Sequence, residues 1–166
     1  FVGAATNDAA NTLLGKVYLT AGDKTNATTA LMKEYGKFTL QSNYSKLWDL
    51  SNKNCSESIF EVQYKGGTNN PYSKYWALFT PLDNRCITAW GMGVNQVSED
   101  LWNAFENSDP RRDASIQNGY TNSSGDHIET KFCIKWRDDK AVLNGLTEAA
   151  DNNFIILRYA DVLLML

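Results

Sequence analysis

The sequence predicts a mainly α-helical fold with short strands and long loops. Three stretches carry this prediction: a pair of amphipathic segments over residues 6–35, an apolar run over residues 155–166, and an aromatic-rich stretch over residues 65–97 without a sustained period. Apolar residues three and four positions apart predict a helix, whereas a long stretch without a period predicts a functional loop or disorder. With 166 residues, the chain is long enough for one domain with its own core.

Residues 6–35 predict a helical hairpin. Thr6 or Asn7 can cap the first helix, and Thr25 or Asn26 can cap the second, because their side-chain oxygens accept the unpaired N–H groups of a first turn. The apolar side chains expected to face inward are Ala10, Leu13, Leu14, Val17, Tyr18 and Ala21 in the first helix, and Ala27, Ala30, Leu31 and Tyr35 in the second.

Gly22 and Gly36 are placed to end these two helices, since glycine adopts the left-handed conformation of a helix end. Two such helices joined by a short turn form one tetratricopeptide-like pair, with a period of about 34 residues. A single pair cannot bury both of its faces, so we expect a neighbouring pair. Residues 155–166 are expected to be the start of a further helical unit.

Shorter elements are predicted between these segments. Residues 56–64 predict a strand whose apolar face carries Phe60, Val62 and Tyr64. The remaining predictions are a short helix over 44–50, a helix over 98–107 that Ser98 caps and that turns Leu101, Trp102 and Phe105 inward, a turn at 109–111, two strands over 113–118 and 130–136 that form a hairpin, and a polar linker over 137–152.

The composition gives no support for several classes of function. A formal net charge of −3 without a basic patch does not favour nucleic-acid binding. The single histidine, His127, cannot build a zinc site alone, because such sites need several nitrogen or sulfur ligands. Cys55, Cys86 and Cys133 form no CxxC pair, and their apolar surroundings favour buried free thiols over a disulfide. No cofactor is implied, and no apolar run is long enough to span a bilayer.

Five blocks of the sequence carry a resemblance to a known family. They are LLGKVYLTAGD at 13–23, GKFTL at 36–40, SESIFEVQY at 56–64, EDLWNAFENSDPRRDASI at 99–116 and NFIILRYADVLLML at 153–166. In this order the blocks resemble the SusD/RagB family of cell-surface, glycan-binding outer-membrane lipoproteins of Bacteroidetes. Family members are considerably longer, so the resemblance implies that residues 1–166 are a single partial SusD-like domain from the middle of one.

The resemblance also implies a fold and a function. It implies tetratricopeptide-like helical hairpins, incomplete in this segment, that support an irregular ligand-binding region over residues 65–97. The implied function is non-catalytic binding of oligosaccharide or polysaccharide at the cell surface, for delivery to a SusC-like TonB-dependent outer-membrane transporter. The lipid anchor of the family would lie outside this sequence.

Side chains suited to a sugar are concentrated within residues 65–97. Aromatic rings bind the apolar face of a sugar ring, while amides and charged groups bind its hydroxyls. The residues predicted to contact a glycan are Trp76, Tyr75, Tyr72, Trp90, Arg85 and Asn84. The alternative for each aromatic residue is an ordinary place in the core.

Two other classes of function stay open at this point. A helical-repeat scaffold without glycan binding would hold protein partners on its helix faces. A glycosidase would need two carboxylates that face each other across a sugar. Glu99 and Asp100 are adjacent on a predicted helix and diverge by about 100°, so they cannot pair in this way, and we predict no enzyme. Arg158 and Asp161, three positions apart, are expected to form a structural ion pair.

Overall fold

A computed structural model describes residues 2–67, 69–82, 91–122, 124–144 and 147–166. The chain divides into two compact units, each with a core of its own. The terminal unit comprises Phe1–Ser42, Asn52–Gln63 and Asn153–Leu166, and the central unit comprises Asn43–Ser51 and Tyr64–Asn152. The fold is a mixture of helices and small sheets, because the described residues form three two-stranded antiparallel sheets among the helices.

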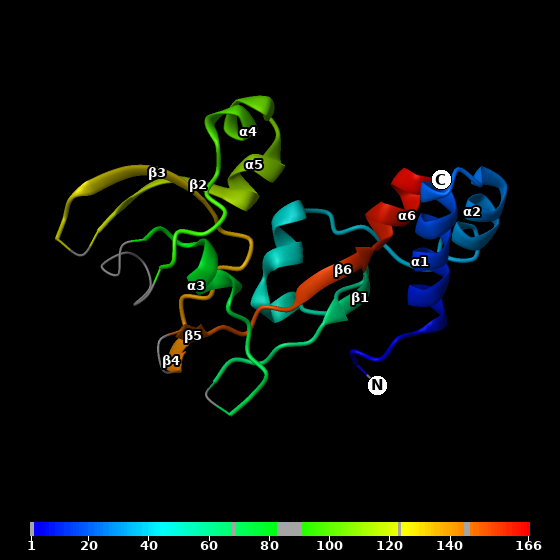
Figure 1. Ribbon diagram of the computed structural model, residues 1–166, viewed down its shortest axis with the longest axis horizontal. Helices are drawn as coiled ribbons and strands as arrows, with labels where there is room; N and C mark the ends of the chain where they lie inside the picture. Colours follow the sequence, from blue (N-terminus) through cyan, green and yellow to red (C-terminus); the bar gives the residue numbers. More distant parts are fainter. Residues whose placement is uncertain (1, 68, 83–90, 123, 145–146) are drawn as a thin grey trace. The chain divides into compact units, whose positions relative to one another are not determined.

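The described residues of the terminal unit form helices and one two-stranded sheet (Figure 1). Its elements are α1 (Asn7–Thr20), α2 (Lys24–Leu31), β1 (Ser58–Val62), β6 (Phe154–Arg158) and α6 (Tyr159–Met165). Thr6 caps α1 as predicted, and its hydroxyl accepts the N–H of Ala9 at 3.1 Å. The predicted cap of α2 is wrong by two to three residues, because the carboxylate of Asp23 accepts the N–H of Asn26 at 3.0 Å. Gly22 directly follows the C-cap of α1 and has a φ angle of +82°, as predicted for a glycine at a helix end. Gly36 has a φ angle of +81°, but α2 already ends at Leu31, so the prediction that Gly36 ends this helix is wrong.

The hairpin of α1 and α2 is held by a close approach of the two helices. Leu31 is fully buried, and a Cβ atom added at Gly15 would lie 2.4 Å from the Cγ of Leu31. Because glycine has no side chain, Gly15 lets the backbones of α1 and α2 come close together, and even a methyl group would not fit between them. The other buried residues of α1 are also small: Ala9 and Thr12.

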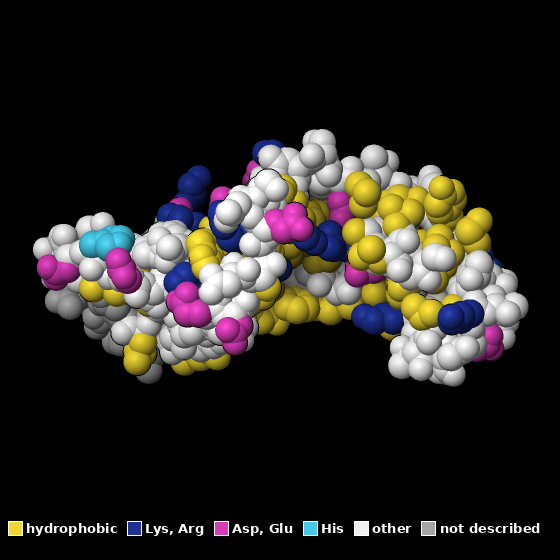
Figure 2. Space-filling model, turned by 90° about the horizontal axis from the view of Figure 1, so that it is seen from above, with side chains coloured by type: hydrophobic (Ala, Val, Ile, Leu, Met, Phe, Trp, Pro, Cys, Tyr) yellow, Lys and Arg dark blue, Asp and Glu magenta, His cyan; other side chains and the backbone are white. Residues whose placement is uncertain are grey.

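Small residues thus form the buried side of α1, and its larger apolar residues are exposed to solvent. Leu13, Leu14 and Val17 are 51%, 42% and 55% exposed, so the prediction that they face inward is wrong for this chain. The predicted inward place of Tyr35 is also wrong, since this residue is 58% exposed. Figure 2 shows hydrophobic side chains gathered on the surface of the part formed by α1, α2 and α6.

The apolar run near the C-terminus forms a strand before it forms a helix. Residues 154–158 pair antiparallel with β1, in the register Glu61↔Ile155 and Val62↔Phe154, and α6 begins only at Tyr159. The prediction of one helix over 155–166 is wrong in its first part. The segment FIILR contains two β-branched isoleucines, and a short apolar run cannot be assigned to helix or strand from its period alone.

Arg158 and Asp161 have different roles at the start of α6. The carboxylate of Asp161 accepts the backbone N–H of Arg158 at 2.9 Å and so caps the helix. The guanidinium of Arg158 forms its ion pair with the buried carboxylate of Glu57, also at 2.9 Å. The prediction that these two side chains form an ion pair is therefore corrected: the guanidinium of Arg158 pairs with Glu57, which directly precedes β1, and Asp161 binds the backbone of Arg158.

The described residues of the central unit form short helices and two β-hairpins (Figure 1). Its elements are the 3-10 helix η1 (Tyr44–Trp48), α3 (Tyr75–Phe79), α4 (Glu99–Ala104), α5 (Pro110–Ser115), β2 (Ile116–Thr121), β3 (His127–Cys133), β4 (Val142–Asn144) and β5 (Thr147–Ala149); a second 3-10 turn, η2, spans Leu50–Asn52. Ser98 caps α4 as predicted, with its hydroxyl 3.1 Å from the N–H of Leu101. The predicted hairpin is confirmed with shifted bounds, whereas the predicted linker over 137–152 contains the β4–β5 hairpin.

Trp76 lies at the centre of the core of the central unit. It is fully buried with Phe132, Ala150 and Tyr120, and the rings of Tyr120 and Phe132 meet edge to face at 6.0 Å. A sugar cannot stack on an indole that has no exposed surface. The prediction that Trp76 contacts a glycan is therefore replaced by the alternative, a place in the core.

None of the helices in the described part of the chain combines the length and the apolar character needed to cross a bilayer.

Replacing Trp76 tests its place in the core. We expect Trp76→Ala in the full-length protein to lower the free energy of unfolding by about 3–5 kcal/mol, because it removes a large buried ring and leaves a cavity. Denaturant unfolding measures this loss. Tyr72→Ala is the control: Tyr72 is half-buried beside Lys74, and its removal should cost about 1 kcal/mol or less. A Trp76→Ala protein that unfolds like wild type but no longer binds a glycan would return Trp76 to the candidate sugar contacts.

Candidate functional site

The central unit carries a cluster of aromatic rings on its surface. The cluster, named here the aromatic cluster, consists of Tyr44, Trp48, Tyr64, Tyr75, Phe79 and Trp136. All six residues are half-buried, so each ring packs on its neighbours and keeps part of its surface in solvent. They come from four stretches of the sequence that are far apart, and the fold alone brings them together.

Trp136 is the ring that joins these stretches. Its centroid lies 5.3 Å from that of Tyr75, 5.1 Å from that of Phe79 and 6.1 Å from that of Trp48. These separations and tilted or edge-on angles are those of favourable aromatic pairs. Tyr75 is stacked on Phe79 within α3, and burial raises the pKa of the Tyr75 hydroxyl.

Lys135 lies over two rings of the aromatic cluster. Its Nζ atom is 4.9 Å from the centroid of Trp48 and 5.9 Å from that of Tyr44, both within the range of a cation–π interaction. Because Lys135 and Trp136 are consecutive, the packing of the indole also fixes where the ammonium group lies.

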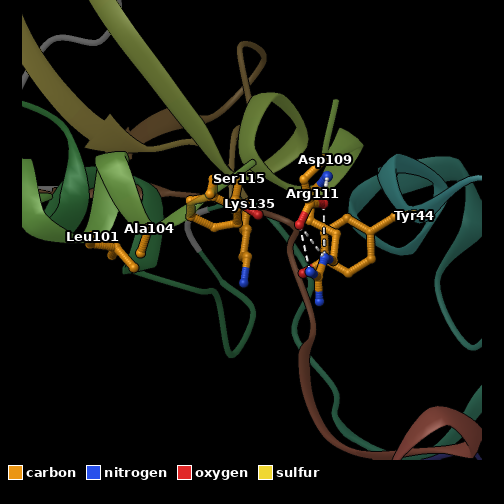
Figure 3. Close-up of a pocket in the computed structure, with 8 residues that line it drawn as sticks. Tyr44, Leu101, Ala104, Asp109, Arg111, Ser115 and Lys135 are labelled. Atoms are coloured by element: carbon orange, nitrogen blue, oxygen red, sulfur yellow. Dashed lines mark hydrogen bonds and ion pairs between the residues drawn. The ribbon is translucent and has the colours of Figure 1, made fainter. Parts of the chain in front are cut away.

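A pocket of about 280 Å³ opens beside Tyr44 and Lys135 (Figure 3). We name it the α4–α5 pocket; it is lined by Tyr44, Leu101, Ala104, Phe105, Asp109, Arg111, Ser115 and Lys135. Figure 3 shows the Arg111 guanidinium bound to Asp109 beside the ring of Tyr44, with the apolar side chains of Leu101 and Ala104 at the other end of the pocket. One wall is thus apolar and the other is charged.

Asp109 and Arg111 form the charged wall around the start of α5. Asp109 caps this helix by accepting the N–H of Arg111 at 2.9 Å. The Nε of Arg111 donates to both carboxylate oxygens of Asp109, at 2.9 and 3.0 Å. These hydrogen bonds from Arg111 lower the pKa of Asp109 to about 2. The predicted turn at 109–111 is therefore a helix start that also positions Arg111.

Of the residues predicted to contact a glycan, one belongs to this site. Tyr75 lies in the aromatic cluster, whereas its neighbour Trp76 lies in the core. Tyr72 is half-buried with the ammonium of Lys74 5.8 Å from its ring centroid. The three other predicted residues, Trp90, Arg85 and Asn84, lie outside the residues that the structure describes.

The sequence alone did not indicate that Trp48, Trp136, Arg111 and Lys135 belong to one site. The two tryptophans themselves were a signal, because a tryptophan in a predicted loop or on a short helix is expected to bury much of its ring against other residues. Nothing local indicated that residues about 90 positions apart would meet, because that contact depends on the tertiary fold.

Within the described ranges, no group of three or more His, Cys, Asp or Glu side chains is arranged to hold a metal ion. Cys55 and Cys133 are free and half-buried, and burial raises the pKa of the Cys133 thiol. The third cysteine, Cys86, lies outside the described residues.

Solved structures provide the comparison that decides the fold. A laminarin-binding SusD-like protein matches with a TM-score of 0.77 at 27% identity, over 98% of this chain and 43% of that one. The chain has a SusD-like fold. A SusD superfamily protein from Parabacteroides distasonis matches with a TM-score of 0.78 at 22% identity, over 98% of this chain and 39% of that one. Surface glycan-binding protein A from Bacteroides thetaiotaomicron, in complex with laminarihexaose, matches with a TM-score of 0.77 at 19% identity, over 99% and 43%.

These matches confirm the SusD/RagB resemblance indicated by the five sequence blocks. No protein-family model matches the sequence, and no curated protein matches it significantly. The chain spans about two fifths of the length of the SusD-like structures it matches.

The pairing of Asp109 with Arg111 can be tested by titration. We expect the Asp109 carboxyl to titrate at a pKa of about 2, below its usual value of about 3.9. Since the folded-state pKa is the lower one, the contribution of this pair to stability is present above pH 4 and is lost as the pH falls toward 2. NMR of the side-chain carboxyl carbon measures the pKa. Arg111→Gln should raise it toward the usual value, and an ordinary pKa in the wild-type protein would contradict the pairing.

Proposed function

We propose that this chain belongs to a cell-surface protein that binds an oligosaccharide or polysaccharide and does not catalyse its cleavage. The observation that carries the proposal is the aromatic cluster beside the α4–α5 pocket. Half-buried rings offer flat apolar surface to a sugar, and the neighbouring charged and hydroxyl groups offer partners to its hydroxyls.

The SusD-like structures support this proposal through what they are named to bind. One is described as binding laminarin, one is in complex with laminarihexaose, and a third contains a xylogluco-oligosaccharide. Several are surface glycan-binding proteins of Bacteroides species. A shared fold does not fix the ligand, so the site of this chain must supply the chemistry.

The SusD-like fold also supports finer proposals about the whole protein. We place it at the outer-membrane surface, held by a lipid anchor, where it delivers glycan to a SusC-like TonB-dependent transporter. The hairpin of α1 and α2 would be one of its tetratricopeptide-like units. The small-residue contact of Gly15 with Leu31 is compatible with that close helical pair.

A second candidate function is a helical-repeat scaffold that binds a protein partner and no glycan. The observation that favours it is the exposed apolar face of α1, made by Leu13, Leu14 and Val17. Exposed apolar surface of this kind is covered by another protein segment in many assemblies. The two candidates differ in which unit they use, so substitutions in the aromatic cluster separate them.

Removing the central ring of the aromatic cluster tests glycan binding. In the full-length protein, we expect Trp136→Ala to weaken glycan affinity by about 5- to 150-fold, the effect of losing one well-packed aromatic contact. Calorimetric titration measures the affinity, and a melting curve shows whether the fold survives. Trp136→Phe should keep part of the affinity because it keeps a ring in the cluster.

Trp102→Ala is the matched control. Trp102 is also a half-buried tryptophan of the central unit, but it packs under Arg112 and Lys131 and is not part of the aromatic cluster. Its replacement should leave affinity within about twofold of wild type. If Trp136→Ala binds glycan like wild type while remaining folded, the aromatic cluster is not the binding surface.

A further inference from the structure

We propose that the α4–α5 pocket selects glycans that carry a carboxylate, such as uronic-acid residues, over neutral glycans. The inference rests on the proposed glycan-binding function and names the chemical class of its ligand. It follows from the balance of charge in the pocket, from the position of Lys135 and from the shape of the opposite wall.

The charges that line the pocket do not cancel. Among the described residues that line the pocket, Arg111 and Lys135 are cationic and Asp109 is the only acidic one. Asp109 is already saturated by Arg111, which binds both of its oxygens. The carboxylate of Glu106 also acts on the Arg111 guanidinium through its charge, but its effect on the pKa of Arg111 is weaker than that of Asp109. The described lining of the pocket therefore carries one net positive charge.

Lys135 supplies that charge in a fixed place. Within the described part of the chain, no carboxylate pairs with its ammonium group, which lies against the rings of Trp48 and Tyr44. Since these two rings form an apolar side to the ammonium group, its attraction for an anion is less screened than at a fully open surface. A carboxylate that reaches Lys135 would form a charge-assisted hydrogen bond there.

Arg111 can contribute a second donor to the same anion. Its Nε and Nη2 atoms bind Asp109, and Nη1 takes no part in that pair. The side chain is 64% exposed, so its remaining N–H groups face solvent at the edge of the pocket. A planar guanidinium with one edge held by a carboxylate is oriented in advance for a second one.

The opposite, apolar wall of the pocket can bind the apolar face of the sugar ring that bears the carboxylate. Leu101, Ala104 and Phe105 give apolar surface at the other end of the pocket (Figure 3). A uronic acid has one charged group on a ring with an apolar face, which matches one charged wall and one apolar wall. A neutral sugar would leave the ammonium of Lys135 without a charged partner, which costs affinity relative to an acidic one.

The test compares each acidic glycan with its own methyl ester. The probes are short oligomers of galacturonate, glucuronate and mannuronate, each with its fully methyl-esterified form, and laminarihexaose as a neutral glucan. Esterification removes the charge and leaves the ring. In titrations of the full-length protein, we expect at least one acid to bind about tenfold or more tightly than its ester, and raising NaCl from about 0.05 M to about 0.5 M should reduce this ratio.

Variants at Lys135 assign the preference to the pocket. Lys135→Gln should lower affinity for the acid about tenfold more than it lowers affinity for the ester. Lys135→Arg keeps the charge and should keep the preference for the acid. Lys33→Gln removes an exposed lysine in the terminal unit and is the charge-matched control, with no expected effect. Melting curves show that each variant is folded.

The outcomes separate this inference from the proposed function. Equal affinity for acid and ester, binding of neutral laminarihexaose alone, or equal loss of acid and ester binding in Lys135→Gln would each overturn the selection of acidic glycans while glycan binding stands. Failure of every glycan to bind would contradict the proposed function itself, and the inference with it.

Discussion

The packing of Trp136 against three other rings is the interaction on which the candidate site depends. Trp136 follows β3, Tyr75 and Phe79 lie on α3, and Trp48 ends η1, so one side chain fixes three separate segments of the central unit. Loops without regular secondary structure contribute few backbone hydrogen bonds, and buried aromatic area replaces part of that stabilisation. The position of Lys135 follows directly, because its backbone is held by the neighbouring indole.

The same packing explains which aromatic residue of α3 can act in binding. Tyr75 and Trp76 are consecutive in a helix, so their side chains leave the axis in directions about 100° apart. One reaches the surface cluster and the other reaches the core with Phe132. Tryptophan offers a larger ring to a sugar than tyrosine does, but it also fills a larger volume in a core. In this fold Trp76 is a core residue.

Local features of the sequence predicted local structure well. The caps at Thr6 and Ser98 and the hairpin of β2 and β3 depend on residues close in sequence, and the structure confirms them. Long-range contacts decided the rest. Phe154–Arg158 forms a strand that pairs with β1. On α1, Gly15 rather than Leu13 lies against Leu31 of α2, and Leu13 is exposed to solvent. The contact of Trp48 with Trp136 had no local signal at all, so the candidate site was predicted only in part, through Tyr75.

The contact between Gly15 and Leu31 has a consequence for protein engineering. Replacing a helix glycine by alanine is a common way to raise thermostability, because alanine lowers the entropy of the unfolded chain and favours the helix. At Gly15 the added methyl group would lie 2.4 Å from the Cγ of Leu31, so the same change would force the two helices apart. A consensus-based or automated redesign that treats Gly15 as an ordinary helix position would therefore lose stability where its rule anticipates a gain.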